Sequence, residues 1–175
     1  MDLRADASVS FPLDVVFVAY RDRLVETTEH LPNIRAIKVL SREERGPDVA
    51  LVNEWTGGGD IPSVARAFLS ESMLKWTDHA LWKAASHEVD WRTEVHAFPG
   101  AVSSSGTNRF FDAGSGATRI EIRGDFVVDA AKVPGVPRLL ARSVGPAIEK
   151  FFVHQIQLNA IAVAKAVGKL IAASG

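Results

Sequence analysis

Apolar residues recur with a helical period through the C-terminal part of the chain. From Pro146 onward the apolar positions are Ile148, Phe152, Ile156, Ala160, Val163, Val167 and Ile171. This spacing of three or four residues persists for about seven turns and predicts one long helix within residues 134–171. At 1.5 Å per residue such a helix spans roughly 40 Å, so its apolar face needs a cover of similar length.

A strand pattern dominates the chain before that helix. Apolar and polar residues alternate, which is typical of strands with one buried face. The alternating stretches are 3–11, 34–41, 49–55, 73–82, 87–97, 101–111 and 117–129. Short turns such as Gly46-Pro47-Asp48 and Asp112–Gly116 join neighbouring stretches, so we expect an antiparallel sheet.

A helix interrupts the strands near the N-terminus. Pro12 and Asp14 suit a helix start, and Pro32 ends the helical pattern because it disfavours helix at the residue before it. The run Gly57-Gly58-Gly59 predicts a loop, and residues 63–69 fit a short helix or covering segment.

Helices at the two ends of a run of strands predict an α+β fold. We expect a curved antiparallel β-sheet of about six to seven strands wrapped around the long C-terminal helix. A cavity remains between the two when the sheet is wider than the helix can fill. No repeat or long linker divides the chain, so residues 1–175 are predicted to form a single domain.

Composition and charge narrow the possible functions. The 175 residues include no cysteine, which excludes thiol chemistry and disulfides, and the net charge of −1 argues against nucleic-acid binding by a basic face. Acidic residues near Met1 do not resemble a signal peptide, and no window approaches 18 uninterrupted apolar residues. We expect a cytoplasmic protein without an integral membrane span. Transient contact with a membrane surface stays open.

The order and lengths of these elements resemble the helix-grip fold of the START/Bet v 1-like superfamily, which includes polyketide cyclases and lipid-transfer proteins. The resemblance extends from Leu3 to Ile171. It is carried by Phe11-Pro12 with Tyr20-Arg21-Asp22, by Leu31–Ile34, and by the strand ending Arg42–Gly46. The segment around Pro62 also looks like the PRELI-type phospholipid-transfer branch. The resemblance implies a hydrophobic small molecule or lipid held between sheet and helix, with no cofactor.

Asp78 is the most informative polar residue in the predicted strands. It shares the register of Trp76 and Trp82, where an alternating strand should be apolar. A carboxylate on the inner face has its pKa raised by desolvation and could orient a ligand or move a proton. Alternatively, a bulge near Thr77 would turn Asp78 outward.

Other candidate residues follow from the same registers. Asn53 lies in register with Leu51 and Trp55, and His154 lies beside the apolar stripe of the long helix. An inward position of the apolar candidates is explained either by packing in the core or by contact with a ligand. The predicted ligand-binding residues are Asn53, Trp55, Trp76, Asp78, Trp91, Phe110, Phe126, Phe152 and Ile156, and the candidate catalytic residues are Asp78 and His154. The histidine spacing matches no metal motif, so no metal site is expected.

The sequence therefore leads to a binding or transport protein for a hydrophobic small molecule or lipid. A cyclase/aromatase-like enzyme that uses Asp78 or His154 is an alternative. A protein-interaction module of the same fold is a third, and it would expose an apolar patch in place of a pocket.

Overall fold

The computed structural model describes residues 1–58, 70–136 and 138–174. Seven antiparallel strands form one sheet in the order β1-β7-β6-β5-β4-β3-β2. The strands are β1 (Asp2–Val9), β2 (Ile34–Arg45), β3 (Asp48–Gly57), β4 (Lys75–Lys83), β5 (Glu88–Val95), β6 (Val102–Gly114) and β7 (Ala117–Val128). The helices are α1 (Leu13–Asp22), the 3-10 helices η1 (Val25–His30), η2 (Glu71–Met73) and η3 (Ala130–Lys132), and α3 (Arg138–Ala173).

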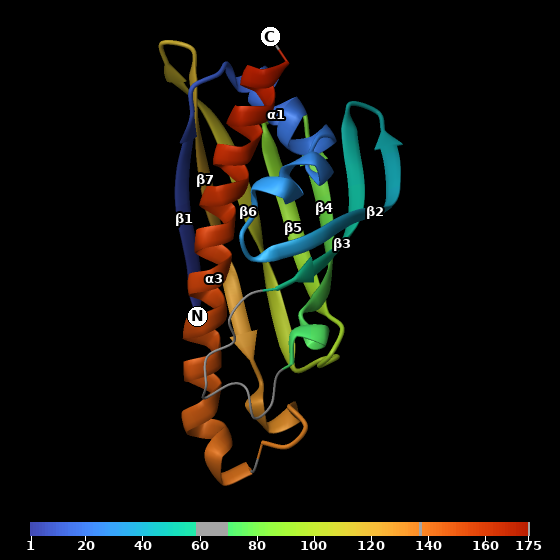
Figure 1. The fold of residues 1–175 in the computed structure, drawn as a ribbon, viewed down its shortest axis with the longest axis vertical. Coiled ribbons are helices and arrows are strands. Elements are labelled where there is room, and N and C mark those ends of the chain that lie inside the picture. Colours follow the sequence, from blue (N-terminus) through green and yellow to red (C-terminus); the bar gives the residue numbers. More distant parts are fainter. Residues whose placement is uncertain (59–69, 137, 175) are drawn as a thin grey trace.

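The long helix α3 runs along the concave face of the curved sheet and packs mainly on β1 and β7 (Figure 1). At its C-terminal end, α1 and η1 lie between the helix and the sheet (Figure 1). This arrangement confirms the predicted α+β helix-grip fold. It also gives α3 two different surroundings along its length.

Helix α3 is longer than its apolar stripe. It begins at Arg138, so Pro146 lies inside the helix. By length and composition alone, Gly145–Ala173 is apolar enough to cross a membrane. About 22% of the most apolar window of this segment is buried. One face of α3, with Val153, Val163 and Val167, packs into the core against the sheet.

The first helix is shorter than predicted. Instead of one helix up to Pro32, α1 ends at Asp22 and the chain continues as the 3-10 helix η1. The hydroxyls of Thr27 and Thr28 donate to the backbone carbonyls of Leu24 and Val25, at 2.6 and 2.7 Å. Such bonds compete with regular α-helical pairing and favour the tighter turn.

One strand also departs from simple alternation. Ile34 and Ile37 of β2 are both buried, although strict alternation places them on opposite faces. A register irregularity between Ile34 and Ala36 adds a residue to β2 and turns Ile37 inward. Beyond this point β2 is exposed, and it forms the edge of the sheet.

Candidate functional site

A cavity of about 470 Å³ lies between the concave face of the sheet and the middle of α3, from Ile148 to Val163. Its volume is in the range of small-molecule sites. All four tryptophans of the chain line it: Trp55, Trp76, Trp82 and Trp91. Helix α3 contributes Ile148, Phe151, Phe152, Gln155, Ile156, Asn159, Ala160 and Val163.

A row of polar side chains crosses the floor of this cavity. Asn53 of β3 is the register partner of Asp78 on β4, Asp78 pairs with Thr93 on β5, and Thr93 pairs with Ser104 on β6. All four residues line the cavity. We call them the polar ladder. It is a hydrogen-bonding strip across four strands of an otherwise apolar surface.

Asp78 is the acidic member of the polar ladder. The pairing of β4 with β5 is continuous from Trp76 to Lys83, so no bulge turns Asp78 outward, and its side chain faces the cavity. Burial raises the pKa of Asp78 to about 7, while a side-chain hydrogen bond from Asn53 acts in the opposite direction. The carboxyl therefore exchanges its proton near neutral pH.

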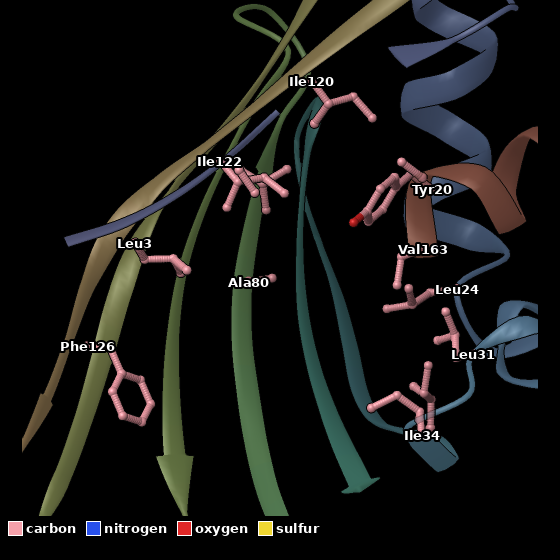
Figure 2. Close-up of a cluster of buried hydrophobic side chains, with 14 of the residues drawn as sticks. Leu3, Tyr20, Leu24, Leu31, Ile34, Ala80, Ile120, Ile122, Phe126 and Val163 are labelled. Carbon is pink, nitrogen blue, oxygen red and sulfur yellow. The ribbon is translucent and has the colours of Figure 1, made fainter. Parts of the chain in front are cut away.

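Tyr20 of α1 reaches the same region from the opposite side. Figure 2 shows its hydroxyl oxygen pointing from the helix toward the sheet. Burial raises the pKa of Tyr20, and the negative charge of Asp78 raises it further. The Tyr20 hydroxyl consequently keeps its proton at neutral pH and serves as a hydrogen-bond donor beside an apolar space.

Several buried polar atoms that belong to cavity-lining residues have no hydrogen-bond partner in the described part of the chain. They are Ser104 Oγ, Asn159 Oδ1, Trp55 Nε1 and Trp82 Nε1. Other polar groups in the cavity are paired. Trp91 Nε1 donates to Asn108 Oδ1 at 2.9 Å, and Asn33 Nδ2 donates to Gln155 Oε1 at 3.1 Å. Unpaired buried groups are rare in native proteins and require an explanation.

Aromatic pairs flank the polar ladder. Trp55 and Trp76 stack with ring centroids 5.8 Å apart and planes 11° apart, next to Asn53 and Asp78 along their strands. At the other end Phe126, the register partner of Ser104, stacks on Phe152 of α3 with centroids 5.6 Å apart. The cavity is thus built for apolar surface at its ends and hydrogen bonds across its middle.

Eight of the nine predicted ligand-binding residues line the cavity: Asn53, Trp55, Trp76, Asp78, Trp91, Phe126, Phe152 and Ile156. Their contact with a ligand stays a prediction. Phe110 is not among the lining residues, because α1 folds over it and it packs against Phe17 and Tyr20. His154 is exposed and does not line the cavity either, since it lies to one side of the stripe that faces the sheet.

Several polar lining residues were not among the predicted site residues. Thr93 and Ser104 complete the polar ladder, and Gln155 and Asn159 line the cavity from α3. Strand alternation could have identified Thr93, because Thr93 lies on the same face of β5 as Trp91. Cross-strand register identifies the row as a whole, and register is not visible in a single strand. Among the residues that the structure describes, no group of acidic and histidine side chains could hold a metal ion.

Solved structures share this fold across nearly the whole chain. TTHA0849 from Thermus thermophilus is 16% identical with a TM-score of 0.68, and each chain is covered completely. The ZhuI aromatase/cyclase from a Streptomyces species is 17% identical with a TM-score of 0.64, covering 97% of this chain and 92% of its own.

A START superfamily protein from Mycobacterium smegmatis is 13% identical with a TM-score of 0.57, covering 97% of this chain and 98% of its own. These similarities confirm the START/Bet v 1-like fold. The finer resemblance to the PRELI-type branch depends on the segment around Pro62, which lies outside the described residues, and it stays a prediction.

The sequence itself gives a narrower relationship. No curated protein matches it significantly. Residues 5–158 match the family described as "Protein of unknown function (DUF2505)". Because this match extends over most of the chain and includes every strand of the sheet except the first residues of β1, the protein belongs to the DUF2505 family.

Proposed function

We propose that this protein binds or carries a hydrophobic small molecule or lipid in the cavity between the sheet and α3. The observation that supports this most directly is the cavity of about 470 Å³, whose walls are mainly aliphatic and aromatic and whose floor carries the polar ladder. Affinity would come from burial of apolar ligand surface, at about 25 cal/mol per Å², while the polar ladder would fix orientation.

The proposal treats residues 1–175 as one ligand-binding domain that acts in the cytoplasm and does not bind nucleic acid. The small molecule is its principal partner, and transient contact with a membrane surface is compatible with uptake of a lipid. The near-neutral charge balance supports the exclusion of nucleic acid.

Native mass spectrometry of the freshly purified protein, followed by organic extraction, tests the proposal. We expect a co-purifying apolar compound in a defined ratio, or stoichiometric uptake of an apolar fluorescent probe. All four tryptophans line the cavity, so occupancy should also change the intrinsic fluorescence. An empty protein that takes up no probe would contradict the proposal and favour the interaction-module alternative.

A second candidate function is proton transfer on the bound molecule, as a cyclase/aromatase-like enzyme would perform. Asp78 supports it, because a carboxyl with a pKa of about 7 both accepts and donates protons near neutral pH. Tyr20 would supply a hydrogen bond to a developing negative charge. The similar fold of an aromatase/cyclase is compatible with this candidate. His154 is the weaker of the two predicted catalytic residues because it is exposed.

Turnover and binding separate the two functions. In an enzyme, Asp78→Asn should abolish turnover of a bound substrate while its affinity for an apolar ligand stays within a few-fold. Equal loss of turnover and affinity in this variant would count against an acid-base role for Asp78.

A further inference from the structure

We infer that the cavity selects ring-containing ligands that carry hydrogen-bonding oxygen and no negative charge, and that Asp78 and its neighbours on the polar ladder enforce this selection. The inference rests on the proposed binding function and specifies the chemical class of the ligand. Three independent features of the cavity support it: its unpaired polar atoms, its charges and its aromatic ends.

The unpaired atoms define complementary groups on the ligand. Trp55 Nε1 only donates, so it requires an acceptor such as a carbonyl or ether oxygen. Asn159 Oδ1 only accepts, so it requires a hydroxyl or N–H donor, and Ser104 Oγ is compatible with either. A pure hydrocarbon leaves these three atoms and Trp82 Nε1 unpaired, and this reduces its affinity.

The charges of the cavity lining disfavour a negatively charged ligand group at the polar ladder. Of the cavity-lining residues in the described ranges, those that titrate are Tyr20, Lys75 and Asp78. The polar groups that α1 and α3 contribute to the described lining are the Tyr20 hydroxyl and the uncharged amides Gln155 and Asn159. A ligand carboxylate placed there meets a second carboxyl and no cation, so one of the two must take up a proton.

Among the described lining residues Lys75 is the one cation, and it lies away from the polar ladder. It is exposed at the start of β4, three residues and thus about 10 Å along the strand from Asp78. A long-chain carboxylate could put its head group beside Lys75 and only its hydrocarbon tail inside. That pose leaves Ser104 Oγ and Asn159 Oδ1 unpaired, so the structure favours the oxygen-bearing ring ligand.

The aromatic ends favour flat rings. The Trp55–Trp76 and Phe126–Phe152 stacks bound the polar ladder on both sides, and a planar ring packs on such faces with little loss of conformational freedom. The ligand is therefore best described as a ring system with a hydroxyl or carbonyl near its centre.

A matched series on one ring system tests this inference. Isothermal titration calorimetry would compare naphthalene, 2-naphthalenemethanol, 2-acetylnaphthalene and 2-naphthoate at pH 8 and pH 6. We expect the alcohol and the ketone to bind several-fold more tightly than naphthalene. At pH 8 the carboxylate should bind about tenfold more weakly than the alcohol, and this gap should narrow at pH 6 as Asp78 takes up its proton.

Two variants assign the selection to Asp78. Asp78→Asn should remove the pH-dependent gap between carboxylate and alcohol while it keeps binding of the alcohol. The matched control is Asp125→Asn, which removes the same charge from an exposed position of β7 and should keep the gap. Wild-type protein that binds the carboxylate as tightly as the alcohol at pH 8, or a gap that still narrows from pH 8 to pH 6 in Asp78→Asn, would overturn the inference.

Titration with dodecanoate tests the alternative pose, in which a long-chain carboxylate puts its head group beside Lys75. Dodecanoate that binds more tightly than any of the neutral ring compounds, with binding lost in Lys75→Gln and unchanged in Asp78→Asn, would also overturn the inference while it upholds the proposed binding function. If no probe binds, naphthalene and dodecanoate included, the proposed function itself fails. Selectivity and binding are therefore tested separately.

Discussion

The two ends of the concave sheet face bury aromatic side chains in different ways. At the end covered by α1, Phe17 contacts Trp82 and Phe110 edge-to-face with ring centroids 5.2 Å apart, and all three rings are buried. At the end away from α1, Trp55, Trp76 and Phe152 are only partly buried, and together with the middle of α3 they surround a cavity.

The difference lies in what covers the sheet. Alternation supplies inward aromatic rings at both ends, but α1 fits closely onto only one of them. The other end is spanned by α3, which runs along the curved sheet (Figure 1). There the inward-facing residues include Asn53 and Asp78. One end thus contributes stability and the other is available for binding. Substitutions at the two ends should separate these roles.

The largest expected effect is the loss of a packed ring. Phe110→Ala should lower the free energy of unfolding by about 3–5 kcal/mol, because it opens a void between α1 and the sheet. Phe152→Ala should cost about 1–2 kcal/mol, since this ring already borders empty space. Urea unfolding measures both. Equal losses would mean that the two ends do not differ as the structure indicates.

Gly106→Ala should disturb the cavity floor. A Cβ at Gly106 would lie 2.2 Å from the carbonyl oxygen of Arg123 and 2.6 Å from Cζ2 of Trp91, so strand β7 and the indole must both move. We expect a loss of about 3 kcal/mol and weaker binding of apolar probes. Thermal unfolding and probe titration measure these effects. Ser105→Ala, at an exposed neighbouring position, is the control and should change stability by less than about 0.5 kcal/mol.

Asp78→Asn should raise stability in a pH-dependent manner. The folded protein holds the Asp78 proton up to a pKa of about 7, whereas the unfolded chain releases it near the ordinary value of 3.8. The folded state binds more protons between these values, so its stability falls as pH rises from about 4 to about 7 and stays lower above.

The asparagine side chain does not titrate and removes that dependence. At pH 8 the variant should be more stable by on the order of 4 kcal/mol, and at pH 4 it should match the wild type. Unfolding curves from pH 4 to pH 8 measure the difference. A constant offset at all pH values would show that folding does not raise the pKa of Asp78.

The smallest expected effect on stability is that of Ser104→Ala. The Ser104 hydroxyl is buried without a partner, so its removal should change the free energy of unfolding by less than about 1 kcal/mol, toward higher stability. Affinity for an oxygen-bearing ligand such as 2-naphthalenemethanol should fall several-fold, as measured by calorimetry. An unchanged affinity would indicate that Ser104 does not contact the ligand.

The sequence by itself determined the elements and their faces. Strict alternation in β4 placed Trp76, Asp78, Ala80 and Trp82 on one side of the sheet, and the structure has all four on the cavity lining. The helical period likewise predicted α3 and its inward residues. Such periodicity is a local property of the chain, because side-chain direction follows from backbone geometry within a few residues.

Only the tertiary structure decided which inward residues are packed and which surround space. Phe110 and Phe126 are both inward aromatic residues of neighbouring strands, yet α1 covers the first and the second lines the cavity. The register that aligns Thr93 and Ser104 with Asp78 depends on strand pairing, and the bulge that turns Ile37 inward depends on how β2 pairs with β3. Close packing and register depend on contacts between distant segments, and no local pattern in the chain specifies them.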